Sequence, residues 1–302
     1  DAKVWRTMGL DSGYQIETRS DDLASGQLAY EIARSGTTVS THKFYTGDAE
    51  RLEVSNSGID VTGAITVNGA ALAGGVELVK TVDVTSTSTY TPTSGTKFVT
   101  VYACGGGAGA GGLNHSTGSQ YGSGSSGAGG AGGTGVRTYT AAELGSTASV
   151  TIGAGGSGGS GDATGSNGGT TTFDPAGSGT TLIGYGGGGG RGITLNAAER
   201  TGLFGSGGGT SGAQVQFIGL CGNANTPRTA AGSTVNVQAN TGGASFFGGM
   251  NSTRTASNGS SDNGQDAASH GAGGNGAVAY GAAGTKNGGS GKAGLIMIME
   301  YA

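Results

Sequence analysis

Apolar and polar residues alternate in several short segments of the first hundred positions. Residues 14–18, 27–34 and 51–55 each have an apolar side chain at every second position. A period of two over such lengths predicts half-buried β-strands. Glycines separate these segments at intervals of about ten residues, which is typical of an antiparallel or meandering sheet. Because no segment has a convincing helical period, the pattern predicts a β-rich module over residues 1–75.

Residues 59–69 predict two very short strands that are separated by Gly63. One copy of such a strip has too little apolar surface to bury by itself, so we expect other copies of the chain to supply the missing face. The expected assembly is therefore an oligomer joined through residues 1–75. Residues 76–95 are expected to be a connector.

The second part of the chain places short apolar strands directly before glycine tracts. Strand patterns at residues 96–103, 148–152 and 181–185 each lead into a run of glycines, and an apolar segment at residues 294–301 closes the chain. A flexible linker is the simplest interpretation of a glycine tract. Here strands hold the tracts at their ends, so we expect ordered tracts within a glycine-rich domain at residues 96–302.

The expected form of these tracts is an extended helix with three residues per turn, of the polyproline II type. Ordering a glycine costs more backbone entropy than ordering other residues. Hydrogen bonds between neighbouring tracts would offset this cost, since no Cβ atom keeps the backbones apart, and weak Cα–H···O contacts would add to them. Sheets are expected to cover the bundle.

Composition changes near Gly105 and excludes several classes of protein. Of the 70 glycines 11 precede this residue, and of the 19 acidic residues 12 do. Proline is nearly absent and glycine does not recur at every third position, which excludes collagen. The net charge of −4 argues against a nucleic-acid partner. The longest apolar run, residues 295–299, is too short to cross a bilayer, and the start at Asp1 without a leader indicates a fragment or a processed product.

The sequence resembles parts of bacteriophage tail fibres. Residues 59–69 look like the shaft strips of these fibres, and residues 96–302 look like the glycine-rich distal domain that ends many of them. The features that carry the resemblance are Val4-Trp5, the turn at 32–36, residues 51–54, the entry Val-Thr-Val-Tyr-Ala-Cys-Gly-Gly-Gly at 99–107, Val-Thr-Ile-Gly-Ala-Gly-Gly at 150–156 and the apolar exit ending Glu300-Tyr301. The pattern is also similar to the polyglycine tip adhesins of T-even-like phages. It is more distantly similar to the glycine-rich domain of the anaplastic lymphoma kinase family, a tumour-necrosis-factor-like sandwich with polyglycine helices.

The resemblance implies an all-β fold. In it, residues 1–75 form a trimeric β module that trimerises the chain and connects it to the fibre shaft, and residues 96–302 form a glycine-rich distal tip domain. This domain would be a β-sandwich of the jelly-roll or tumour-necrosis-factor-like kind with packed polyglycine II-type helices. The resemblance also implies a homotrimeric fibre tip in the virion, assembled in the host cytoplasm. Its expected partners are upstream tail fibre or tail proteins and a receptor, protein or polysaccharide, on the bacterial surface. No nucleic acid, membrane insertion or cofactor is expected.

Catalytic motifs carry little weight in this composition. Roughly five G-x-G-x-x-G matches are expected by chance over the glycine-rich part, and the strand–helix context of the nucleotide-binding motif is missing. A glycosidase needs two carboxylates that face one cleft, whereas the acids after Gly105 are widely scattered. Histidine and cysteine show no metal-ligand spacing, and a Ser-His-Asp arrangement has no support. We therefore expect no enzyme, no catalytic residue and no metal site.

The candidate receptor contacts are side chains at the interruptions between glycine tracts, because a tract without side chains cannot discriminate between partners. Arg191 and Phe204 are exposed candidates of this kind. The leading patch is expected to be Phe246, Phe247, Met250 and Asn251, and the second patch Asn114, His115, Gln120 and Tyr121. The alternative for the two phenylalanines is a local core plug.

The two cysteines are both expected to be buried, because Cys104 ends a strand and Cys221 follows an apolar segment. In the reducing cytoplasm that the resemblance implies, free thiols are the default, and one disulfide is the alternative. Two other functions stay open for the whole chain. One is a purely structural tip or spacer without receptor contact, and the other is a polysaccharide-degrading tailspike.

Overall fold

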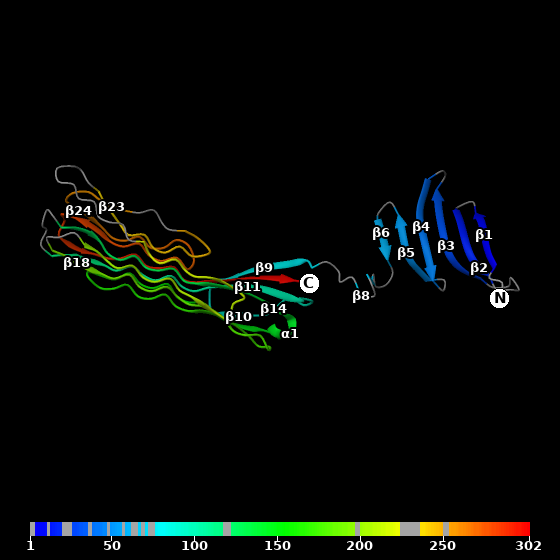
Figure 1. Cartoon of the computed structure of the whole chain (residues 1–302), viewed down its shortest axis with the longest axis horizontal. Coiled ribbons are helices and arrows are strands. Elements are labelled where there is room, and N and C mark those ends of the chain that lie inside the picture. The colour runs from blue at the N-terminus through cyan, green and yellow to red at the C-terminus, as the bar shows by residue number, and fades with distance from the viewer. Residues whose placement is uncertain are drawn as a thin grey trace. The chain divides into compact units, whose positions relative to one another are not determined.

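A computed structural model divides the chain into two compact units, Asp1–Gly75 and Val76–Ala302. The structure describes residues 4–10, 13–19, 26–35, 38–46, 49–55, 58–61, 66–67, 70–71, 76–116, 122–196, 200–223, 236–249 and 254–302. Each unit is described by itself (Figure 1).

The first unit contains a six-stranded antiparallel meander in which each strand pairs with the next in the sequence. Its strands are β1 (Val4–Leu10), β2 (Gly13–Arg19), β3 (Gly26–Ser35), β4 (Thr38–Thr46), β5 (Ala49–Ser55) and β6 (Gly58–Val61). A two-stranded pair of β7 (Thr66–Val67) and β8 (Ala70–Ala71) follows. These strands confirm the β-rich character that the alternating pattern predicts.

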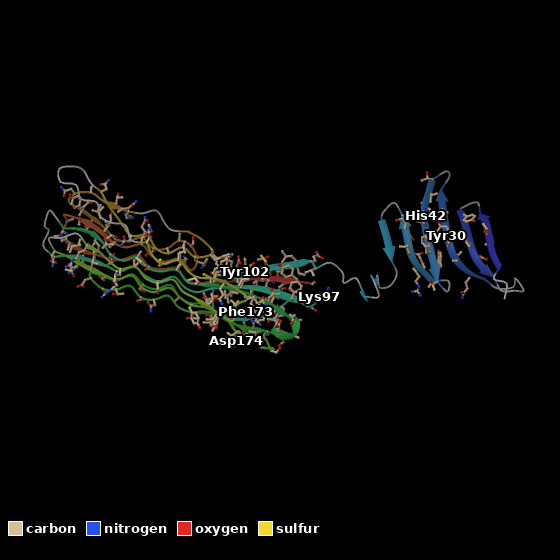
Figure 2. The ribbon with its side chains drawn as sticks, viewed as in Figure 1. Tyr30, His42, Lys97, Tyr102, Phe173 and Asp174 are labelled. Atoms are coloured by element: carbon tan, nitrogen blue, oxygen red, sulfur yellow. The ribbon has the colours of Figure 1, made fainter. Side chains whose placement is uncertain are left out.

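The meander is a single layer with polar and aromatic contacts on its surface. Tyr30 and His42 lie on neighbouring strands (Figure 2), with the Tyr30 hydroxyl oxygen 2.6 Å from Nδ1 of His42. The Lys43 ammonium lies 2.8 Å from Glu50 and 3.0 Å from Glu53. Among the residues of this unit whose exposure is described, none is fully buried. The described part of the sheet therefore does not build a closed hydrophobic core.

Two five-stranded sheets form one half of the second unit. One has the order β10-β15-β16-β17-β20 and the other the order β21-β14-β11-β27-β9. Their strands are β9 (Leu78–Val84), β10 (Ser88–Tyr90), β11 (Phe98–Cys104), β14 (Thr134–Thr140), β15 (Ala148–Thr151), β16 (Thr171–Pro175), β17 (Leu182–Gly184), β20 (Thr210–Ser211), β21 (Val215–Phe217) and β27 (Leu295–Tyr301). The described elements are almost all strands, with α1 (Ala141–Leu144) as the helix, so the predicted all-β class is confirmed.

Both sheets contribute side chains to one hydrophobic core. Its fully buried members include Val99 and Val101 of β11, Phe173 of β16, and Ile296 and Ile298 of β27. These residues alternate along their strands with half-buried ones, as a sheet with one face in a core requires. The predicted strands at residues 96–103, 148–152, 181–185 and 294–301 correspond to β11, β15, β17 and β27.

The prediction of a connector over residues 76–95 is wrong. β9 pairs with the C-terminal strand β27, and β10 pairs with β15, so this stretch adds an edge strand to each of the two sheets. Val82 and Val84 pack against the shared core. Burial of these valines gives the segment an apolar partner that a linker would not need.

The glycine tracts form a hydrogen-bonded lattice in which segment 105–112 is enclosed by six others. Backbone N–H groups at positions 106, 109 and 112 donate to segment 163–169, those at 107 and 110 to 287–294, and those at 105, 108 and 111 to 127–133. Its carbonyl groups accept from segments 153–159, 187–190 and 271–277. The partner changes with each residue and returns after three, which is the repeat of an extended three-residue-per-turn helix.

Segment 126–133 occupies a second centre of the same kind. Its backbone hydrogen-bonds with segments 105–111, 185–191, 202–208, 218–222, 240–245 and 271–277. All residues of 105–112 and 126–133 are buried. The described tracts are therefore ordered, as the sequence predicts.

Close approach of the backbones explains why this lattice needs glycine. A Cβ atom on Gly129 would lie 2.1 Å from the carbonyl oxygen of Ala108, and one on Gly187 would lie 2.1 Å from that of Gly130. Real Cβ atoms essentially never come so close to backbone atoms. Glycine is thus required by the spacing between neighbouring segments and not by an unusual backbone conformation.

Three small sheets lie at the end of the second unit that is farther from the C-terminus (Figure 1). They have the orders β18-β12-β26, β19-β13-β25-β24 and β22-β23. Their strands are β12 (Leu113–His115), β13 (Ser123–Ser125), β18 (Ile193–Leu195), β19 (Arg200–Thr201), β22 (Val237–Gln238), β23 (Thr255–Ala256), β24 (Ser260–Asp262), β25 (Val278–Tyr280) and β26 (Gly284–Lys286). We call this part of the second unit the far end.

Candidate binding surface

The lattice itself offers little to a partner, because its backbone groups are used internally. The two central segments are fully buried and hydrogen-bond to their surrounding segments at nearly every residue. Outward-facing positions on the peripheral segments 153–159 and 163–169 are mostly glycine, alanine and serine. Recognition by this unit therefore depends on side chains at the ends of the segments and on the few large side chains along them.

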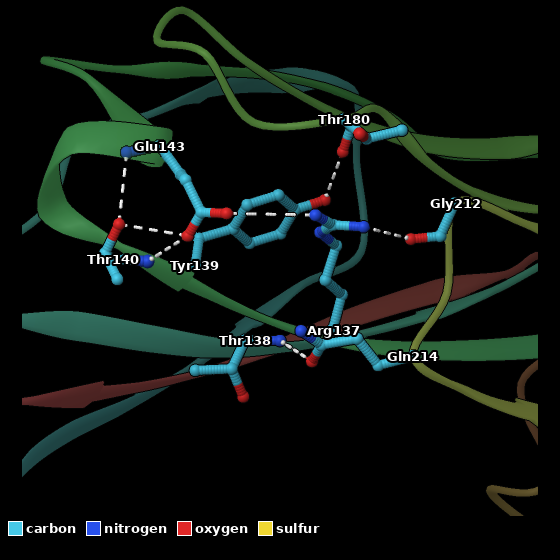
Figure 3. Close-up of polar contacts among 8 residues, drawn as sticks. All are labelled: Arg137, Thr138, Tyr139, Thr140, Glu143, Thr180, Gly212 and Gln214. Atoms are coloured by element: carbon cyan, nitrogen blue, oxygen red, sulfur yellow. Dashed lines mark hydrogen bonds and ion pairs between the residues drawn. The ribbon is translucent and has the colours of Figure 1, made fainter.

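Hydrogen bonds and an ion pair join the polar side chains around α1 to one another and to neighbouring loops (Figure 3). Thr140 and Glu143 form a capping box, with the Thr140 backbone N–H donating to the Glu143 carboxylate at 2.9 Å. The Thr140 hydroxyl also donates to this carboxylate at 2.9 Å. The hydrogen bonds from the backbone and the side chain of Thr140 hold the pKa of Glu143 below its ordinary value. Arg137 lies 3.8 Å from Glu143 and donates to the carbonyl of Gly212 at 3.0 Å, with its guanidinium above the Tyr139 ring. The cluster joins α1 to neighbouring loops and is a structural feature.

The acids that the sequence left open for catalysis also have structural partners. The six described acids after Gly105 and their partners are Glu143 with Thr140, Asp162 with Thr194, Asp174 with Thr181, Asp262 with Arg254, Asp266 with the Ser290 backbone, and Glu300 with Tyr90. Glu199 lies outside the described residues. Within the described ranges, no group of three or more His, Cys, Asp or Glu residues is placed to hold a metal ion.

The second predicted contact patch is only partly described, and the expectation of an exposed His115 is wrong. His115 is 1 % exposed, and its Nδ1 lies 2.7 Å from the carbonyl oxygen of Ala282. It belongs to β12, the central strand of its sheet, where alternation places it on the same buried side as Leu113. Asn114 points to the other side and is half-buried. Gln120 and Tyr121 lie outside the described residues.

The leading predicted patch lies on a sheet and not at the far end. Phe246 is 47 % exposed, and its ring centroid lies 5.8 Å from that of Tyr102 and 4.8 Å from that of Phe217. Phe247 is half-buried and meets Phe246 edge to face at 5.2 Å. Phe246 thus covers the face of β11 that points away from the shared core, and half of it stays exposed to a partner.

Met250 and Asn251 lie outside the described residues. The described residues of the two predicted patches lie in different parts of the glycine-rich domain. Phe246 contacts β11 and β21, whereas Asn114 lies in β12 among the small sheets of the far end (Figure 1; Tyr102 of β11 is marked in Figure 2).

Sequence reasoning missed most of a group of exposed apolar side chains within residues 203–220, of which Phe217 contacts Phe246. Phe204, which the sequence did suggest as exposed, is 46 % accessible. Arg191, suggested with it, is also exposed. The other members of the group are Leu203, Val215, Phe217, Ile218 and Leu220, all between 42 % and 72 % exposed. The signal available in the sequence is that residues 201–223 contain large apolar residues and no charged residue.

The two cysteines are free and lie in different surroundings. Cys104 is buried, as expected, and burial raises the pKa of its thiol to about 11. Cys221 is exposed, so the expectation that it is buried is wrong. It follows Leu220 on a peripheral segment whose inward positions are taken by glycine. No disulfide joins the two residues.

Comparison with protein families agrees with this architecture. The protein family described as a glycine-rich domain matches residues 81–301 of the chain. The chain belongs to this family. The matched range begins inside β9 and ends at the last residue of β27, so the glycine-rich domain comprises both sheets, the lattice and the far end. Among curated proteins, no relative matches the chain.

The described part of the glycine-rich domain and of the first unit contains no helix with the length and hydropathy needed to cross a bilayer.

Proposed function

We propose that the chain is the distal part of a bacteriophage tail fibre and that it acts as a homotrimeric adhesin. The first unit would trimerise and connect to upstream tail fibre or tail proteins. The glycine-rich domain would present side chains at the interruptions of its lattice to a receptor on the bacterial surface. The finer fold that accompanies this proposal is a jelly-roll or tumour-necrosis-factor-like sandwich with polyglycine II-type helices.

The observation that carries the proposal is the doubly centred glycine lattice. Two segments, 105–112 and 126–133, are each enclosed by six hydrogen-bonded neighbours. Such a lattice is a stiff rod with few side chains, and it separates the two large sheets from the far end. A rod of this kind suits a protein that must hold variable side chains at a distance from its attachment point, because binding residues on a rigid scaffold can change without unfolding it.

Three copies that meet the same surface would bind with higher avidity than one copy, even if each site is weak. The proposed location is the virion, with assembly in the host cytoplasm. The proposal includes no enzymatic activity. The alternatives are a spacer without receptor contact and a tailspike that degrades polysaccharide.

Binding of the fluorescently labelled chain to intact bacteria from a panel of strains tests the proposal. An adhesin binds some strains saturably and leaves others unlabelled, and unlabelled chain in excess competes with it. A spacer binds none of them. Release of reducing sugar from purified surface polysaccharide by the chain would favour the tailspike and overturn the proposal.

A further inference from the structure

We propose that one flank of the glycine-rich domain is an interface between copies of this chain. The inference rests on the homotrimer of the proposed function and assigns it a second contact surface beyond the first unit. The apolar flank is defined by Leu203, Phe204, Val215, Phe217, Ile218 and Leu220.

The apolar flank combines strand β21, which carries Val215 and Phe217, with two neighbouring segments of the lattice. The Gly219 N–H donates to the Gly208 carbonyl at 2.9 Å, and the Gly222 N–H donates to the Gly205 carbonyl at 3.2 Å. These glycines are buried, because every third residue of each segment turns towards the centre. Other positions of the two segments face outward, and among them Leu203 is 61 % exposed and Ile218 72 %.

The exposed area reaches the upper end of what a typical monomer shows. Large aromatic side chains have about 150–250 Å² each, and with areas at the lower end of this range for the aliphatic members the exposed fractions of the six residues correspond to roughly 500–650 Å². The largest apolar patch on a typical monomer covers about 300–600 Å², and a standard interface buries about 800 Å² on each partner. The patch therefore has most of the area that a specific interface needs.

Large apolar and aromatic side chains distinguish this flank, since segments 153–159 and 163–169 on the opposite side carry no charged residue either. No charged residue occurs between Arg200 and Arg228 in the sequence. On the opposite side of the lattice, segments 153–159 and 163–169 expose small and polar residues such as Ser157 and Ser166. The centres of protein interfaces are depleted of charge and enriched in aromatic residues. The apolar flank has this composition, and the opposite side does not.

A second copy of the chain is the occupant that the structure favours. The six-stranded meander of the first unit has no fully buried residue among those whose exposure is described, so it too leaves apolar side chains such as Phe44 exposed, at 45 %. Apolar side chains are thus exposed on both units of the chain. Contact between copies through both units would bury them. Once copies are joined through the first unit, the effective concentration of their flanks is high, and a contact of modest area is sufficient.

Cys221 provides a probe within the apolar flank. Its thiol is exposed and directly follows Leu220, whereas the other thiol, Cys104, is buried with a raised pKa and should react slowly. An interface over this flank would shield Cys221 from an uncharged reagent such as N-ethylmaleimide. The labelling rate of the native protein therefore reports whether the flank is covered.

The experiment combines light scattering with N-ethylmaleimide labelling of the full chain. Wild type is compared with two triple variants. The flank variant carries Leu203→Asn, Phe204→Asn and Ile218→Asn, and the control variant on the opposite side carries Ser157→Asn, Ser160→Asn and Ser166→Asn. We expect an assembly of three times 28.8 kDa. In it, we expect Cys221 to react at least about tenfold more slowly in wild type and control than in the flank variant.

The possible failures separate the two proposals. A trimer in which Cys221 reacts equally fast in all three proteins overturns the interface and leaves the homotrimer standing. Slow labelling that is unchanged in the flank variant also overturns the interface, because something other than these side chains then covers the thiol. A monomer near 28.8 kDa overturns both. A trimer whose Cys221 becomes shielded only after bacteria are added assigns the flank to the receptor and overturns self-association there.

Discussion

The hydroxyl of Tyr90 donates a hydrogen bond of 2.8 Å to the carboxylate of Glu300, although the two residues are 210 positions apart in the sequence. Tyr90 lies on β10 of one five-stranded sheet, and Glu300 lies on β27 of the other. The second carboxylate oxygen accepts from the backbone N–H of Thr93 at 3.2 Å. Glu300 is fully buried, so this buried acid links the two sheets at the edge of their shared core.

We expect Glu300→Gln to destabilise the glycine-rich domain by about 1–3 kcal/mol, because an amide nitrogen would face one of the two donors and leave it unpaired in a buried place. Tyr90→Phe should destabilise it for the complementary reason. The double variant should lose less than the sum of the two single losses, since both remove the same contact. Urea unfolding followed by near-ultraviolet circular dichroism of tyrosine measures all three. Strictly additive losses would contradict the pairing.

Stability should also fall in acid because of Glu300. Burial alone would raise the pKa of this carboxyl, but hydrogen bonds from Thr93 and Tyr90 and the charge of Lys80 outweigh it and hold the pKa below its ordinary value of 4.5. A pKa that is lower in the folded state contributes stability above pH 4.5, and this contribution is lost as the pH falls through the folded value.

Unfolding free energies of wild type and Glu300→Gln, measured between about pH 2 and pH 7, test this expectation. The difference between the two proteins should shrink on acidification. Glu143 also has a lowered pKa, so part of the acid sensitivity should remain in the variant. A difference that is constant over the whole range would show that the ionised form of Glu300 is not the one that the fold stabilises.

Adjacent glycines with different surroundings test the lattice. A Cβ atom on Gly208 would lie 2.1 Å from the carbonyl oxygen of Tyr185, whereas one on Gly209 would meet no atom within 4 Å. We expect Gly208→Ala to destabilise the domain by at least about 1–3 kcal/mol through overpacking. Gly209→Ala should be neutral or stabilising by up to about 1 kcal/mol, because it restricts the unfolded chain.

Thermal unfolding of the two variants gives the comparison directly. Equal tolerance of both substitutions would mean that the segment is a flexible linker in solution. Because the two positions are neighbours with the same residue, a general effect of alanine on the chain cannot produce the expected difference.

The sequence predicts the strands of the large sheets because each is a short apolar segment with a boundary at glycine. β11 and β27 illustrate this, and most of their buried and half-buried positions alternate in the structure. β9 was missed as a strand although residues 78–84 alternate in part. Its partner is the C-terminal strand, and pairing over such a separation leaves no local signal.

The order of the glycine tracts could be predicted, but their neighbours could not. Segment 105–112 is bounded by strands, so a rigid form is the physical expectation. Glycine has no side chain to mark which face meets which segment, and the hydrogen-bond partners of Gly106, Gly107 and Ala108 lie in three different parts of the chain. His115 was misplaced for a related reason, since a three-residue strand is too short to show its alternation in the sequence.

Substitution of Phe246 separates an anchor for a partner from a local plug. Its ring is about half exposed, stacks on Tyr102 and packs at a tilt against Phe217. Aromatic pairs contribute about 0.5–1.5 kcal/mol beyond their buried area, so Phe246→Ser should lower the unfolding free energy by about 1–2 kcal/mol and leave the domain folded.

If the exposed half of the Phe246 ring contacts the receptor, this variant should also lose binding to intact bacteria well below its melting temperature. Tyr185→Ser is the matched control, since Tyr185 is 43 % exposed on a different segment, and it should keep full binding. A Phe246→Ser protein that melts at a much lower temperature yet binds bacteria normally below it would identify the ring as a plug and remove it from the contact surface.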